Sequence, residues 1–158
     1  MQPIDLEQEK KDILNKYKSL LRACADKTNK EDKKEIRKAF DLAVEAHKTQ
    51  RRKSGEPYIY HPIAVAHIAA KEIGLGTTSI ICALLHDVVE DTDYTLNEIE
   101  KSFGEKVSKI IDGLTKIQDV FDKNVSEINL GALFYTVLVG LDDQSMLCSY
   151  LEYLKYLG

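Results

Sequence analysis

Apolar residues recur every three or four positions along most of the chain, and charged residues fill the positions between them. This period is typical of amphipathic helices, which bury one face and expose the other to water. It predicts a first helix over residues 6–21. A second helix is predicted to begin at Thr28, because Thr28 and Glu31 have the spacing of a capping box, and to run to His47.

The next two helices are marked by their ends. Proline suits the first position of a helix, so Pro62 places His61 near the N-cap of a third helix, which we expect to end around Gly74. A fourth helix is predicted to begin near Thr77. It contains the apolar run 80–85, which indicates a buried segment.

Two further helices are predicted after residue 94. Thr95 and Glu98 form another capping-box pair, and Gly104 would end the helix that they begin. The buried face of the last helix is predicted to consist of Val107, Ile110, Ile111 and Leu114. No strong alternation of apolar and polar residues, the pattern of a strand, occurs before residue 130, so the sequence predicts an all-α domain.

Composition narrows the class of protein. The 158 residues are 44% hydrophobic and 30% charged, which fits a single globular domain. The sequence has no apolar stretch of about 18 residues and no signal-peptide pattern, so we expect a cytoplasmic protein without a membrane span. The net charge of −4 argues against a general nucleic-acid binder but allows a local basic patch for a small anion. Three cysteines without metal-type spacing are expected to be reduced thiols.

Ionisable residues follow the apolar run of the fourth predicted helix. His86, Asp87, Glu90 and Asp91 fall within six positions, and helical spacing places His86 over Glu90 and Asp87 over Asp91. A carboxylate buried beside such a run needs a partner, such as a metal, a base or water. An ordinary helix C-terminus with solvated acids is the alternative.

A metal site is one way to pair these groups. If the third and fourth helices are antiparallel, the start of one brings His61 close to His86 and Asp87 at the end of the other. Two imidazoles and a carboxylate suit manganese, iron or zinc. A simple capping role for His61 is the alternative, and we interpret His47 and His67 as structural.

Neighbouring residues add the other requirements of phosphate chemistry. Glu90 and Asp91 could orient or deprotonate a water whose pKa a metal lowers. Arg51, Arg52 and Lys53 could hold an anionic substrate, although short basic runs are often only solvated loops. The combination predicts a metal-assisted phosphohydrolase.

Four segments carry a resemblance to a known family. They are residues 52–62 (RKSGEPYIYHP), 83–92 (ALLHDVVEDT), 103–104 (FG) and 113–116 (GLTK). In order and spacing they resemble the hydrolase domain of the RelA/SpoT homologues, which are HD-domain phosphohydrolases. The resemblance covers roughly residues 30–126. It implies an all-α HD-domain helical bundle that uses Mn²⁺ to remove the 3′-diphosphate from guanosine tetra- or pentaphosphate.

The resemblance also implies a role for individual residues. A role is implied only at positions where this sequence has the family's residue. The implied metal ligands are His61, His86 and Asp87, the implied water-activating pair is Glu90 and Asp91, and the implied contacts to the guanine nucleotide are Arg52, Lys53 and Ser54.

The chain departs from the family beyond Ser126. The family has a Leu-Ala-Asp-Arg-Leu-His-Asn type segment whose Asp completes the metal site. Here residues 141–144 (LDDQ) resemble it weakly, with Asp143 in the place of the ligand, which makes Asp143 a candidate fourth ligand. A late apolar helix over residues 147–157 that packs on the core is the alternative.

We therefore expect one HD-type domain over residues 1–158, with an N-terminal helix within 1–27 and a divergent segment at 127–158. It would be either a small single-domain hydrolase or a fragment of a bifunctional enzyme. The predicted activity is hydrolysis of guanosine 3′,5′-bis(diphosphate), ppGpp, to GDP and pyrophosphate. A catalytically impaired nucleotide-binding or regulatory domain and a hydrolase of another phosphorylated nucleotide, such as NADPH, are the alternatives. Metal identity and oligomeric state stay open.

Overall fold

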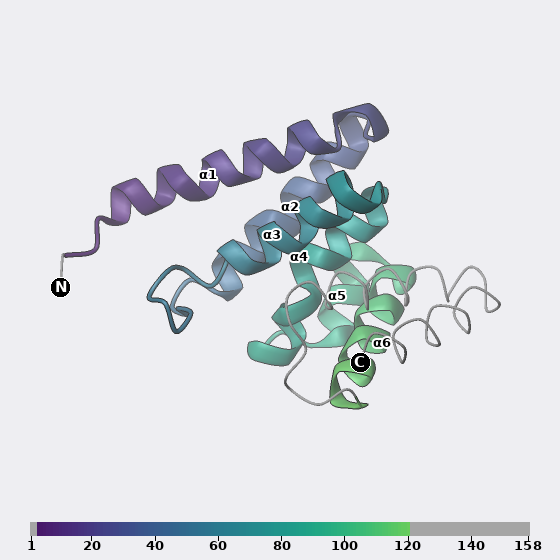
Figure 1. Cartoon of the computed structure of the whole chain (residues 1–158). Helices are drawn as coiled ribbons and strands as arrows, with labels where there is room; N and C mark the ends of the chain where they lie inside the picture. Colours follow the sequence, from purple (N-terminus) through teal and green to yellow (C-terminus); the bar gives the residue numbers. More distant parts are fainter. Residues whose placement is uncertain (1–2, 121–158) are drawn as a thin grey trace, which may run out of the picture. The chain divides into compact units, whose positions relative to one another are not determined.

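A computed structural model of the chain describes residues 3–120 (Figure 1). Within these residues six α-helices occur, and the only strand-like pairing is an isolated bridge between Arg51 and Pro57. The helices are α1 (Leu6–Ala23), α2 (Lys30–Ala46), α3 (Tyr60–Ile68), α4 (Thr77–Asp91), α5 (Leu96–Phe103) and α6 (Glu105–Val120). The predicted all-α fold is confirmed. None of the described helices has the length and apolarity needed to cross a membrane.

The chain divides into two compact units, Met1–Asp93 and Tyr94–Gly158. In the first unit α4 is the central helix, because it packs against both α2 and α3. Every residue from 79 to 88 is buried, polar side chains included. A helix that is buried on all sides must be apolar on all sides, which explains the continuous run at 80–85. The polar residues His86 and Asp87 of α4 therefore lie in the core.

The long helix α1 runs along one side of the first unit and contacts α3 (Figure 1). Its predicted apolar face is buried only in the second half of the helix, where Tyr17 and Leu20 lie in the core and Tyr17 stacks on Phe40 of α2. Leu6 and Leu14, nearer its start, are exposed.

The start of α2 differs from the prediction. Asn29 is the N-cap, and it forms the capping box with Asp32: the Asp32 backbone N–H donates to Asn29 Oδ1 at 2.8 Å, and the Asn29 backbone N–H donates to Asp32 Oδ2 at 3.0 Å. The predicted pair of Thr28 and Glu31 is wrong by one residue. The Thr28 hydroxyl instead donates to the carbonyl of Cys24 at 2.9 Å, because a short 3₁₀ turn at Ala25–Lys27 separates α1 from α2.

Substituting Asn29 tests this assignment. Asn29→Ala should lower the free energy of unfolding by about 1 kcal/mol, because the backbone N–H of Asp32 in the first turn of α2 loses its side-chain acceptor. Thr28→Val is the matched control and should cost clearly less. Urea denaturation of both variants measures the difference, and a larger loss in Thr28→Val would contradict the observed cap.

α3 begins slightly earlier than predicted. Its N-cap is Ile59, so His61 is the second helical residue and Pro62 the third. Proline is still tolerated there, because the first-turn N–H groups of a helix have no partner within it. Beyond Ile68 the helix continues as a π-helical turn, Ala69–Ile73. This helical segment ends at Gly74, whose φ of 77° is left-handed and suits glycine. The predicted end near Gly74 is therefore confirmed.

The described part of the second unit matches the prediction closely. Thr95 and Glu98 form the expected capping box, and Gly104 ends α5 with a φ of 95°. α5 packs against α6. The predicted face of α6 is buried at Val107, Ile110, Ile111 and Leu114.

Candidate metal centre

Two histidines and an aspartate meet between α3 and α4. His61 comes from the first turn of α3, and His86 and Asp87 come from the C-terminal half of α4. All three are buried, and one potential ligand atom from each lies within 4.8 Å of the other two. The two helices pack against each other, which brings together residues 25 positions apart, as the sequence predicted.

The distances within this cluster suit a shared cation. His86 Nε2 lies 3.1 Å and His61 Nε2 lies 3.4 Å from Asp87 Oδ2. Donor atoms that bind a metal at about 2.1 Å are separated by about 3.0 to 3.4 Å in octahedral or tetrahedral arrangements. The two donor pairs that share Asp87 Oδ2 are therefore spaced like ligands of one ion.

The protonation of His86 points the same way. Its Nδ1 lies 2.6 Å from the carbonyl oxygen of Ala83, which can only accept a hydrogen bond, so Nδ1 carries the proton. In the neutral ring the lone pair on Nε2 then faces Asp87 Oδ2, another acceptor. Two acceptors at this distance need a proton or a cation between them. This backbone contact to the second ring nitrogen is the usual arrangement of metal-binding histidines.

Electrostatics favour a charged pair in this cluster when a proton takes the place of a cation. Burial alone would lower the pKa of His86, but the Asp87 carboxylate outweighs it, and the pKa is raised above its usual value. Burial alone would raise the pKa of Asp87, but the charge and hydrogen bond of His86 and a hydrogen bond from Tyr58 hold it well below its usual range. Asp87 is therefore an anion in the core, which balances a cation.

Tyr58 connects the cluster to the end of α4. Its hydroxyl lies 2.8 Å from Asp87 Oδ2 and 3.1 Å from Asp91 Oδ2. Burial and the neighbouring carboxylates raise the pKa of Tyr58, so the hydroxyl remains a proton donor. No sequence pattern marks Tyr58 as a site residue, although it lies inside the 52–62 segment only three positions before His61.

Glu90 and Asp91 are exposed at the C-terminal end of α4. The backbone carbonyl of Asp91 accepts a hydrogen bond from Gln50 Nε2 at 2.7 Å, which ties this end of the helix to the segment after α2. An ordinary solvated helix end would explain the exposure of these two residues. It does not explain Asp87, which is buried and hydrogen-bonded.

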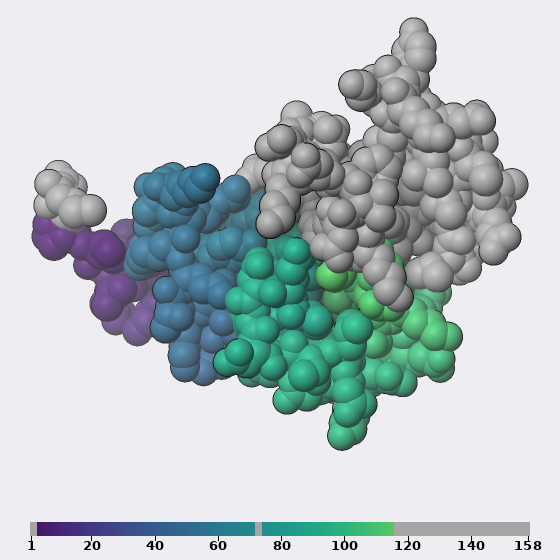
Figure 2. All heavy atoms as spheres, turned by 90° about the horizontal axis from the view of Figure 1, so that it is seen from below, coloured from purple at the N-terminus to yellow at the C-terminus, as the bar shows by residue number. Residues whose placement is uncertain are grey.

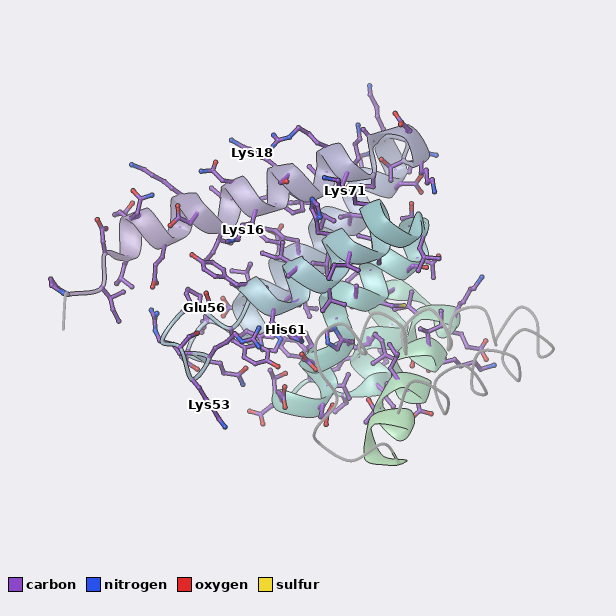
Figure 3. All side chains as sticks on the ribbon, in the orientation of Figure 1. Lys16, Lys18, Lys53, Glu56, His61 and Lys71 are labelled. Carbon is purple, nitrogen blue, oxygen red and sulfur yellow. The ribbon has the colours of Figure 1, made fainter. Side chains whose placement is uncertain are left out.

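The basic loop, residues 51–55, lies at the same end of the unit as His61, as the position of Lys53 shows (Figure 3). The backbone N–H of Gly55 donates to the carbonyl of Arg52 at 2.9 Å, and Gly55 has a φ of 90°, so this tight turn suits glycine. Lys53 and Ser54 are exposed on the turn, and Arg52 is half-buried. The loop therefore presents polar groups to solvent at this end of the unit.

Arg51, in contrast, is engaged with α1. Its guanidinium forms a two-pronged ion pair with Glu9, at 2.8 and 2.9 Å, and also donates to the carbonyl of Gly55 at 2.8 Å. The Arg51 hydrogen bond lowers the pKa of Glu9. Figure 2 shows the first turns of α1 beside the segment that includes this loop. These three contacts use part of the guanidinium, which has five N–H groups, so the expectation that Arg51 could hold an anion stays a prediction.

Some of the remaining predicted residues are packed in the first unit, and others lie outside the described residues. His47 is buried, with Nδ1 2.7 Å from Gln50 Oε1, and half-buried His67 lies near Ser19, so both are packed against neighbours as expected. Cys24 and Cys82 are buried, and neither forms a disulfide within the described residues. Asp143, Cys148 and the late apolar segment lie outside the described residues.

Comparison with known proteins places the cluster in a family. The family model described as "HD domain" matches residues 39–129, a range that contains every residue of the cluster. A "Probable GTP pyrophosphokinase" of Mycobacterium leprae is 48% identical over 85 residues, which are 54% of this chain and 11% of that protein. A "Guanosine-3′,5′-bis(diphosphate) 3′-pyrophosphohydrolase" of Aquifex aeolicus is 52% identical over 83 residues, which are 52% of this chain and 12% of that protein.

A longer match extends over most of the chain. The protein of the same name from Borreliella burgdorferi is 39% identical over 129 residues, which are 78% of this chain and 19% of that protein. The chain thus corresponds to a small part of each of these relatives. The resemblance predicted from the four sequence segments is confirmed, and since the family model spans more than half of the sequence, the chain belongs to the HD domain family.

Proposed function

We propose that this chain hydrolyses ppGpp to GDP and pyrophosphate with a divalent metal ion held by His61, His86 and Asp87. The observation that carries the proposal is the buried cluster, in which one potential ligand atom each of His61, His86 and Asp87 lies within 4.8 Å of the other two. The substrate is inferred from the printed names of the Aquifex and Borreliella relatives, which are similar to this chain over part of their length.

Mn²⁺ is the ion that we propose. Two imidazoles and one carboxylate suit a divalent transition metal, whereas Ca²⁺ prefers oxygen ligands alone. Such an ion supplies Lewis-acid stabilisation of charge on a phosphoryl oxygen and makes a bound water more acidic. We further propose Asp143 as a fourth ligand, on the strength of its place in the 141–144 segment.

The chain's own residues would do the rest. The exposed carboxylates of Glu90 and Asp91 would accept the proton of the attacking water, because they follow Asp87 by one turn of α4. Arg52, Lys53 and Ser54 would hold the nucleotide from a turn whose polar groups are open to solvent. We propose that both compact units form one HD-type domain, which the continuous family match across them supports.

The decisive experiment is a turnover assay with purified protein. With Mn²⁺ present, ppGpp should be converted to GDP and pyrophosphate in equal amounts, and chelation with EDTA should stop the reaction. NADPH assayed in parallel should release no phosphate. Phosphate release from NADPH without ppGpp hydrolysis would contradict the substrate and favour another phosphorylated nucleotide.

A nucleotide-binding domain without turnover is the second candidate. The observation that favours it is the sequence beyond Ser126, where residues 141–144 (LDDQ) stand in place of the family's Leu-Ala-Asp-Arg-Leu-His-Asn type segment. It predicts ppGpp binding that survives EDTA and no product with any divalent metal. Binding and turnover measured on one preparation separate the two candidates.

A further inference from the structure

We propose that Tyr58 is a positioning residue that holds the carboxylates of Asp87 and Asp91 in the orientation needed for metal binding and for acceptance of a proton from water. Its effect on metal binding depends only on the described cluster. Its effect on turnover rests on the proposed function.

The hydroxyl of Tyr58 is shared by two carboxylates. It lies 2.8 Å from Asp87 Oδ2 and 3.1 Å from Asp91 Oδ2. These aspartates are four positions apart on α4, so their like charges lie on neighbouring turns and repel. A phenol has one proton to donate, and from this position it can serve either oxygen. Tyr58 therefore connects the buried carboxylate of the cluster with the exposed carboxylate outside it.

The oxygen that Tyr58 contacts is the important one. Asp87 Oδ2 is also the atom that lies 3.4 Å from His61 Nε2 and 3.1 Å from His86 Nε2. A carboxylate oxygen has more than one lone-pair direction, so it can accept from Tyr58 and still face the histidines. A hydrogen bond to a ligating carboxylate fixes its rotation, and loss of such partners typically costs 10- to 100-fold in metal affinity.

Packing holds the Tyr58 ring in place. The ring lies against His47, with centroids 4.7 Å apart, and meets the edge of His61 at 6.0 Å. The Tyr58 backbone N–H donates to the carbonyl of Gln50 at 3.1 Å, and the Gln50 side chain bonds both His47 and Asp91. The hydroxyl is therefore aimed at the carboxylates by its own ring contacts and by its backbone.

Tyr58→Phe is the test, because it keeps the ring and removes only the hydroxyl. The dissociation constant for Mn²⁺, measured by calorimetry on the full chain without nucleotide, should rise about 10- to 100-fold. In steady-state assays kcat for ppGpp should fall while KM changes little, because the proposed nucleotide contacts, Arg52, Lys53 and Ser54, are unchanged. Thermal melting of the variant confirms that both measurements are made on folded protein.

Tyr60→Phe is the matched control. It removes a hydroxyl two residues away from a ring that faces Lys16 on α1 at 4.8 Å, and Mn²⁺ affinity and kcat should stay at the wild-type values. An unchanged Mn²⁺ dissociation constant in Tyr58→Phe would overturn the proposal, whether or not ppGpp is hydrolysed. Weakened Mn²⁺ binding in a chain that does not hydrolyse ppGpp would instead support the positioning role and reject the substrate.

Discussion

Asp87→Asn is expected to abolish ppGpp hydrolysis and to weaken Mn²⁺ binding by more than about 100-fold, since even outer partners of metal ligands are worth 10- to 100-fold. The amide has nearly the size of the carboxylate but no charge. It leaves the two histidine nitrogens without the anion that makes the cluster attractive to a cation. Calorimetric titration with Mn²⁺ and the turnover assay measure the two losses separately.

Asp41→Asn is a suitable control for this substitution. Asp41 is exposed on α2 in an ion pair with Arg37, and an exposed pair of this kind contributes little. The control should bind Mn²⁺ and hydrolyse ppGpp like the wild type. Full activity in Asp87→Asn would remove Asp87 from the set of ligands and, with it, the proposed metal centre.

Asp91→Asn and Glu90→Gln should each reduce kcat strongly while Mn²⁺ still binds. If one of these carboxylates accepts a proton from the attacking water, its loss should cost about 10² to 10⁴ in kcat. The larger effect is expected for Asp91, because Tyr58 holds its side chain beside Asp87. Neither residue belongs to the buried cluster, so the Mn²⁺ dissociation constant should change by less than in Asp87→Asn.

Comparison of the two substitutions identifies the group that activates water. A drop in kcat in only one variant assigns the role to that residue. If both variants retain wild-type kcat and KM, proton transfer does not depend on the end of α4, and the assignment to Glu90 and Asp91 is wrong.

The helices could be predicted because their information is local. The apolar period predicted α1 and α2, the continuous apolar run predicted α4, and the Thr95–Glu98 pair and Gly104 predicted the bounds of α5. The error at the start of α2 has a physical cause. Thr28 and Asn29 are both good N-caps. The Thr28 hydroxyl donates a hydrogen bond to the carbonyl of Cys24, and Asn29 caps the helix.

The convergence of His61 with His86 and Asp87 could also be predicted, since it needs only an antiparallel pairing of α3 and α4. The contacts around it could not. The role of Tyr58 depends on hydrogen bonds to residues 29 and 33 positions away, and the engagement of Arg51 depends on Glu9, 42 positions earlier. Neither helical periodicity nor local spacing carries information on such pairs.

The ion pair between Arg51 and Glu9 has a consequence for comparisons within the family. The family model matches residues 39–129, so Glu9 lies outside the range that this model covers. Two relatives can share every residue of the cluster and of the 52–62 segment and still differ in what restrains that loop. If the loop holds the nucleotide as proposed, a change in the N-terminal helix would alter the affinity for the nucleotide while every residue of these motifs stays the same.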